Sequence, residues 1–164
     1  MKSSLLLLIV CALAVFTIIP TASAKISDDQ IKSAGAIELT TDLVDKMETA
    51  AKAVREDEAA RNEVAAVKET DADAWAAAVN SKCPKAAAHL QEAGITAEDL
   101  MKGASAILAC MMDESGELAK SDNETAKANA EFVNEHKEHC NTAGGAVMVM
   151  GMGAEPSDSA KSKN

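Results

Sequence analysis

The chain has 164 residues, of which 48% are hydrophobic and 26% are charged, and its formal net charge is −10 at pH 7. Binding to nucleic acid or to anionic lipid needs a basic face, so this acidic balance argues against both partners. Aromatic residues make up only 2% of the chain, so platforms for stacking bases are not expected either. The length fits one small domain with a modest core.

The first 24 residues have the layout of a secretory signal peptide. Lys2 supplies a short basic region, an apolar stretch covers 5–19, and Ala22 and Ala24 form an A-x-A cleavage pattern. The apolar stretch is shorter than the roughly 20 residues that cross a bilayer, although a retained anchor is the alternative. We therefore expect a periplasmic or secreted protein with no membrane span after cleavage.

Removal of residues 1–24 leaves 140 residues with 15 basic and 26 acidic side chains, a net charge of −11. Alanine dominates this part, β-branched and aromatic residues are sparse, and Gly and Pro fall mostly between segments. Such a composition predicts an all-α fold. We expect a helical domain over 25–142, built as a small bundle of four to five antiparallel helices.

The first helix signals lie in the N-terminal half. Ser27, with Gln30 three residues on, has the spacing of a capping box for a short helix that ends at Gly35. Thr41 is the expected cap of a long helix over 41–67, whose apolar residues fall near one stripe.

Three further helices follow in chain order. A short one starts near Asp71, and Pro84 begins the next, for which Gly94 is the stop. Thr96 then caps a helix over 97–112, with Asp99 at the capping-box position.

The C-terminal part is expected to hold a polar loop, the last helix and a tail. The last helix is predicted over 126–140, and residues 143–164 form a Met-rich, then polar segment that we expect to be flexible and disordered. Trp75 and Phe132 are expected to be at least partly buried, because a core this poor in aromatic residues needs them.

One pattern resembles a known family. The stretch HLQEAGITAEDLMKGASAILACMM joins a helix that ends in Ala-Gly to a Thr-capped helix, and Asn129, Phe132 and His136 form an Asn-x-x-Phe-x-x-x-His pattern. The chain here resembles a family of small, uncharacterised, exported alpha-helical bacterial proteins. The stretch LTTDLVDKMETAAKAV looks like the family's first long helix, so the resemblance covers roughly residues 40–140. It implies a helical fold and an exported location, but no activity.

Three cysteines remain after removal of the leader, namely Cys83, Cys110 and Cys140, so at least one is unpaired within a monomer. If the helices that begin at Pro84 and Ala97 form an antiparallel hairpin, Cys83 and Cys110 lie about 15 and 20 Å from its turn. We therefore predict a Cys83–Cys110 disulfide with Cys140 left free.

His136, His139 and Cys140 form the strongest candidate for a metal site. Their i, i+3, i+4 spacing lets all three share one helical face. Imidazole and thiolate bind zinc and copper well, and the nearby methionines add soft sulfur atoms that suit Cu(I). The alternative is structural, because a histidine near a helix C-terminus interacts favourably with the helix dipole. We prefer the structural role for these residues over metal binding.

Catalytic signals are weak. Cys140 and His136 could be imagined as nucleophile and base, but no orienting third group or oxyanion donor is evident. His89, a lone histidine among alanines, is expected to be a packed polar edge and not a ligand.

The sequence thus predicts an exported, non-enzymatic helical protein that acts as a binding or interaction module for an unknown envelope or extracellular protein, without a cofactor. The alternative is a copper- or zinc-binding protein that uses His136, His139 and Cys140. A third hypothesis is a redox sensor in which Cys140 forms disulfide-linked dimers on oxidation.

Overall fold

The computed structural model describes residues 26–69 and 71–150, which form eight α-helices and one 3-10 helix, without a strand among them. The elements are α1 (Asp28–Ala34), α2 (Thr41–Glu56), α3 (Glu58–Ala65), α4 (Ala72–Lys82), α5 (Pro84–Glu92), α6 (Ala97–Met111), the 3-10 helix η1 (Leu118–Lys120), α7 (Glu124–Glu135) and α8 (Lys137–Val149). The all-α prediction is confirmed, but the described residues hold eight helices, not the four to five expected. None of these helices is long and apolar enough to cross a membrane.

Most predicted helix starts are confirmed by their caps. The Ser27 hydroxyl accepts a hydrogen bond from the Gln30 N–H at 3.2 Å, and the Thr96 hydroxyl accepts one from the Asp99 N–H at 3.0 Å. One cap was wrong by a residue. Thr40, not Thr41, caps α2, because its hydroxyl accepts from the Leu43 N–H at 3.2 Å.

The long helix predicted over 41–67 is two helices, because the chain bends at Asp57. The Asp57 backbone has φ −91° and ψ 106°, which is extended and not helical. Its carboxylate accepts hydrogen bonds from the N–H groups of Ala59 and Ala60, so the same residue ends α2 and caps α3.

The predicted C-terminal helix and the start of the predicted tail also differ from the structure. His136, with φ −113° and ψ 32°, separates α7 from α8, so no single helix runs from 126 to 140. Residues 143–149, predicted to begin the tail, continue α8, whose Ala143, Gly144 and Val147 are buried. The predicted domain boundary at 142 therefore falls inside a helix. Residues 1–24 and 151–164 lie outside the described residues.

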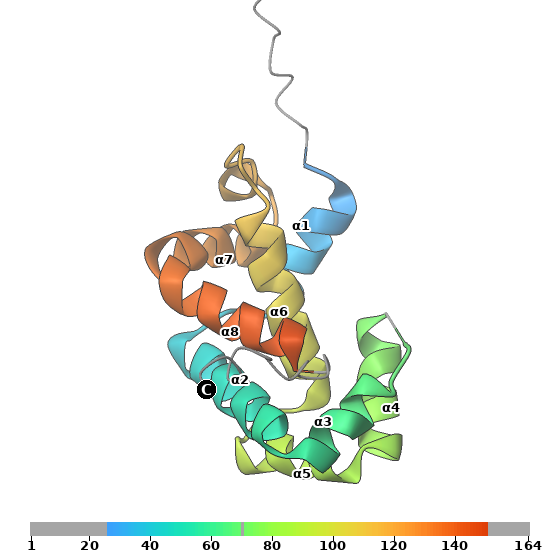
Figure 1. Ribbon diagram of the computed structural model, residues 1–164. Helices are drawn as coiled ribbons and strands as arrows, with labels where there is room; N and C mark the ends of the chain where they lie inside the picture. The colour runs from blue at the N-terminus through green and yellow to red at the C-terminus, as the bar shows by residue number, and fades with distance from the viewer. Residues whose placement is uncertain (1–25, 70, 151–164) are drawn as a thin grey trace, which may run out of the picture.

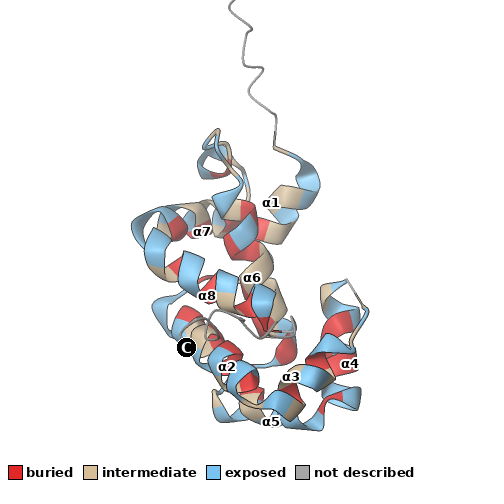
Figure 2. Ribbon diagram, viewed as in Figure 1, coloured by how far each residue is buried: buried red, intermediate tan, exposed pale blue. Residues whose placement is uncertain are grey.

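Helix α6 forms the centre of the fold (Figure 1). It packs against α1, α4, α7 and α8, while α2 packs along α8 and against α3 and α5. Figure 2 shows that the helices are typically buried along one side and exposed along the other. The largest fully buried side chains include Met47 of α2 and Leu100 and Ile107 of α6. Burial of these apolar surfaces is the main source of stability for such a bundle.

Candidate functional site

An apolar groove of about 380 Å³ lies between α3 and α4 on one side and α6 and α8 on the other. Its lining consists of Val64, Ala65, Val67, Trp75, Met101, Ala104, Ser105, Leu108, Val147, Met148 and Met150. Ser105 is the one polar residue in this lining. The groove can therefore accept apolar groups.

Helix periodicity explains how α6 supplies one wall of the groove. Met101, Ala104, Ser105 and Leu108 follow the i, i+3, i+4, i+7 spacing that places side chains on one helical face. The opposite face of α6 is held against the core at Gly103, where an added Cβ would lie 2.6 Å from the Met47 sulfur. Because Gly103 has no side chain, α6 approaches α2 closely and its groove face points away from the core.

The rim of the groove exposes large apolar side chains. Leu108 is 39% exposed and Met148 is 51% exposed, and both line the groove. Met112 is 65% exposed and lies beyond the groove on the C-terminal side of α6. Exposed apolar surface of this kind often marks an interaction site, and methionine adapts its shape to what it contacts.

Trp75 is the only tryptophan of the chain, and it lines the groove from α4. It is buried, and Phe132 is partly buried, so the expectation of burial for both aromatic residues is confirmed. Because the tryptophan lies in the wall of the groove, its fluorescence can report directly on an occupant.

The three side chains of the predicted metal site point to different surroundings. The exposed His136 ring lies 4.5 Å from the Phe132 ring, centroid to centroid, whereas Cys140 is fully buried in the core. His139 Nε2 lies 3.1 Å from Asp45 Oδ1 on α2. His136 has a non-helical backbone at the start of α8, so it lies outside the helix that carries His139 and Cys140. In the part of the chain that the structure describes, no group of three or more His, Cys, Asp or Glu residues could hold a metal ion.

Cys83, Cys110 and Cys140 are all free thiols in the structure, so the predicted Cys83–Cys110 disulfide is not formed. That prediction assumed that α5 and α6 pack against each other as an antiparallel hairpin, and the structure does not show this packing. Helix α5 packs against α2, α3 and α4, while α6 packs against α4 and not primarily against α5. Burial and the charge of Glu63 raise the pKa of the Cys83 thiol.

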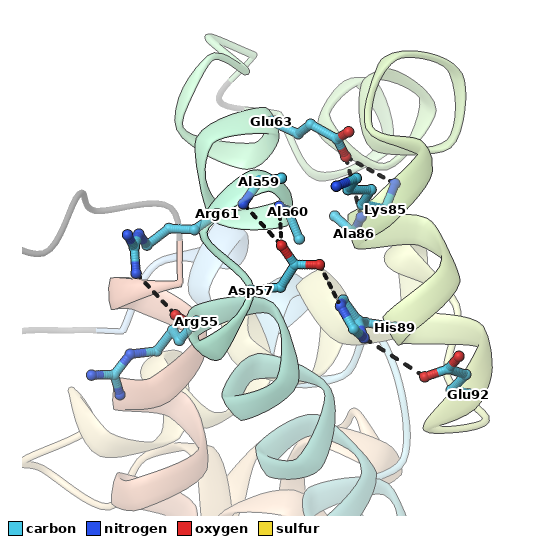
Figure 3. A network of polar contacts seen from close by, with 10 residues as sticks. All are labelled: Arg55, Asp57, Ala59, Ala60, Arg61, Glu63, Lys85, Ala86, His89 and Glu92. Carbon is cyan, nitrogen blue, oxygen red and sulfur yellow. Dashed lines mark hydrogen bonds and ion pairs between the residues drawn. The ribbon is translucent and has the colours of Figure 1, made fainter.

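His89 belongs to a polar junction between α2, α3 and α5 (Figure 3). Its Nε2 lies 3.2 Å from Asp57 Oδ2, and its Nδ1 lies 3.7 Å from Glu92 Oε2. The hydrogen bond from His89 lowers the pKa of the Asp57 carboxyl, and the backbone N–H groups of Ala60 and Ala59 add to this effect. His89 is thus a packed polar edge, as the sequence predicts.

Glu63 completes the same junction from α3. Its Oε2 accepts hydrogen bonds from the N–H groups of Lys85 at 2.9 Å and Ala86 at 3.3 Å (Figure 3). A carboxylate at this place satisfies unpaired donors in the first turn of α5 and interacts favourably with the helix dipole. The junction therefore has a structural explanation for each polar contact.

Comparison of the chain with models of protein families, with curated proteins and with solved structures gave no match. Sequence reasoning missed the groove, although the spacing of Met101, Ala104, Ser105 and Leu108 on one helical face was a usable signal. The wall of the groove that α8 supplies could not be predicted, because its groove residues were assigned to a flexible tail.

Proposed function

We propose that this chain is an exported, non-enzymatic binding protein that holds a small apolar ligand in the groove between α3, α4, α6 and α8. The observation that carries the proposal is the groove lining, in which Ser105 alone is polar. Its volume of about 380 Å³ is within the range of about 300–1,000 Å³ that is typical of small-molecule sites. The flexible Met101 and Met148 side chains suit an occupant of variable shape.

The exported location rests on the leader pattern of residues 1–24. An exported carrier of apolar molecules needs an apolar interior surface and a water-soluble exterior, and the acidic net charge of the chain supplies the latter.

Titration with the neutral apolar dye N-phenyl-1-naphthylamine tests the proposal, using the chain from Lys25 onward. The dye fluoresces strongly only in an apolar environment, so we expect saturable binding with one site per chain. Leu108→Glu places a charge on the groove wall and should weaken the dye affinity about tenfold or more, equivalent to roughly 1.4 kcal/mol.

Met112→Glu is the matched control for this titration. Both residues lie on the surface near the C-terminal end of α6, but Met112 does not line the groove. The control should therefore bind the dye like the wild type. Equal dye binding by Leu108→Glu and Met112→Glu would contradict a ligand in the groove.

A protein partner is the second candidate, and the exposure of Met112 and Val149 beside the groove favours it. An apolar surface that extends past the groove suits an amphipathic partner helix better than a small molecule. In that case Met112→Glu should abolish partner binding while dye binding remains intact.

A further inference from the structure

Cys110 and Cys140 lie on two helices that pack in antiparallel sense. A Cβ added at Gly144 of α8 would lie 3.2 Å from Ile107 Cγ2 of α6, which fixes one contact between the helices. Towards the start of α6, Ala104 lines the same groove as Val147 of α8. In the direction in which the residue numbers of α8 increase, those of α6 therefore decrease, so the two helices run antiparallel.

This alignment places Cys110 and Cys140 about one helical turn beyond the contact between Ile107 and Gly144, at the same α6–α8 interface. Cys110 is three residues after Ile107, and Cys140 is four residues before Gly144, so each lies about one turn along from the fixed contact. Cys110 also packs against the core cluster that contains Cys140. The absence of a side chain at Gly144 allows the helices to approach closely at this end.

The two thiols differ in their access to solvent. Cys140 is fully buried, whereas Cys110 is partly exposed and lines an open pocket of about 560 Å³ near the start of the polar loop. A small oxidant can therefore reach Cys110 first. Burial, together with the charges of Asp113 and of Cys140, raises the pKa of the Cys110 thiol to about 12. The influence of Cys140 on this pKa agrees with their proximity, and the high value makes the reaction slow at neutral pH.

We propose that Cys110 and Cys140 are a thiol pair that closes to an intramolecular disulfide between α6 and α8 when the protein meets a small-molecule disulfide such as oxidised glutathione. The Cys110 thiolate attacks one sulfur of oxidised glutathione and displaces one glutathione thiolate, which takes up a proton. The Cys140 thiolate then attacks the Cys110 sulfur of the mixed disulfide and releases the second glutathione. The two protein thiols are oxidised, and one glutathione disulfide is reduced to two thiols.

Peptide mapping of the full chain tests this pairing. The reduced protein is incubated with oxidised glutathione, its remaining thiols are alkylated, and it is digested with trypsin without reduction. Cleavage after lysine separates all four cysteines, because Cys11 falls in peptide 3–25, Cys83 in 83–85, Cys110 in 103–120 and Cys140 in 138–161. We expect 103–120 linked to 138–161 in monomeric protein, with a mass two hydrogens below the sum of the two peptides.

Variants in which one cysteine is replaced by serine test which thiols form the cross-link. Cys140→Ser should stop the reaction at a glutathione adduct on Cys110, whereas the matched control Cys83→Ser should still form the cross-link in full. A Cys83–Cys110 bridge, a cross-link found only in dimers, or a wild-type protein that carries glutathione on Cys110 without the cross-link would each overturn the proposal.

Discussion

The side-chain amide of Asn129 on α7 holds the segment between α1 and α2 by three hydrogen bonds. Its Oδ1 accepts from the Leu39 N–H at 2.8 Å, and its Nδ2 donates to the carbonyl oxygens of Ala34 and Ile37, both at 2.7 Å. Asn129 is the one buried polar or charged residue among the described residues. A single side chain thus supplies hydrogen-bond partners for three backbone groups that have none within a helix.

Asn129→Ala should destabilise the protein, because it leaves these backbone groups without partners in a buried place. We expect the free energy of unfolding to fall by roughly 2–3 kcal/mol. Urea denaturation followed by circular dichroism measures this change. Asn134→Ala, at an exposed position of the same helix, is the control and should change stability little. Equal effects of the two substitutions would contradict the proposed role of Asn129.

Substitution by alanine should have opposite effects on stability at Gly144 and Gly145, which are neighbours in α8. A Cβ at Gly145 meets nothing within 4 Å, so Gly145→Ala should stabilise the helix by up to about 1 kcal/mol. A Cβ at Gly144 would press on Ile107, which is buried and β-branched and therefore stiff. Gly144→Ala should thus cost roughly 1–3 kcal/mol relative to Gly145→Ala. Thermal unfolding of both variants decides the order, and equal melting temperatures would refute the close packing of α8 on α6.

Acid should weaken the α2–α3–α5 junction through Asp57. The pKa of this carboxyl is lowered from its ordinary value of 3.8, first by His89 and then by backbone N–H groups. A lowered pKa in the folded state means that the contribution to stability is present above the unfolded pKa and is lost as the pH falls through the folded pKa. Asp57→Asn keeps a capping side chain but removes the charge. Its melting temperature should therefore fall less than that of the wild type between pH 6 and pH 2.5, and parallel falls would contradict this account.

Export of the chain should leave Lys25 as its first residue. The prediction follows from the A-x-A pattern at Ala22 and Ala24. Expression of the full sequence in a bacterium with a periplasm, followed by cell fractionation and measurement of the intact mass, checks it. Ala24→Pro, which blocks cleavage at this pattern, is the matched variant and should keep the leader attached. Wild-type protein that keeps its leader in the cytosol would exclude the exported location.

Local signals predicted the helix starts well, because a cap depends only on residues three positions apart. Ser27, Asp71, Pro84 and Thr96 each begin a helix in the structure as expected. The bend at Asp57 was missed because the helical pattern continues on both sides of it. Its hydrogen bond to His89, 32 residues away, is not visible in a local pattern.

The site was harder to predict because its walls come from distant parts of the chain. Residues 143–149 were predicted to begin a flexible tail, but they continue α8 and are partly buried. In the structure Gly144 allows close packing against Ile107, and α8 then supplies one wall of the groove. The Cys83–Cys110 prediction failed for a related reason, because helices adjacent in sequence were assumed to pack as a hairpin.

Quenching of Trp75 by 11-bromo-1-undecanol tests most directly whether an apolar ligand occupies the groove. Bromine quenches tryptophan only at close range, and Trp75 is the only tryptophan in the chain and lines the groove. We expect saturable quenching of the wild type and of Met112→Glu, with the affinity reduced about tenfold in Leu108→Glu. Linear, non-saturating quenching that is the same in all three proteins would contradict this expectation.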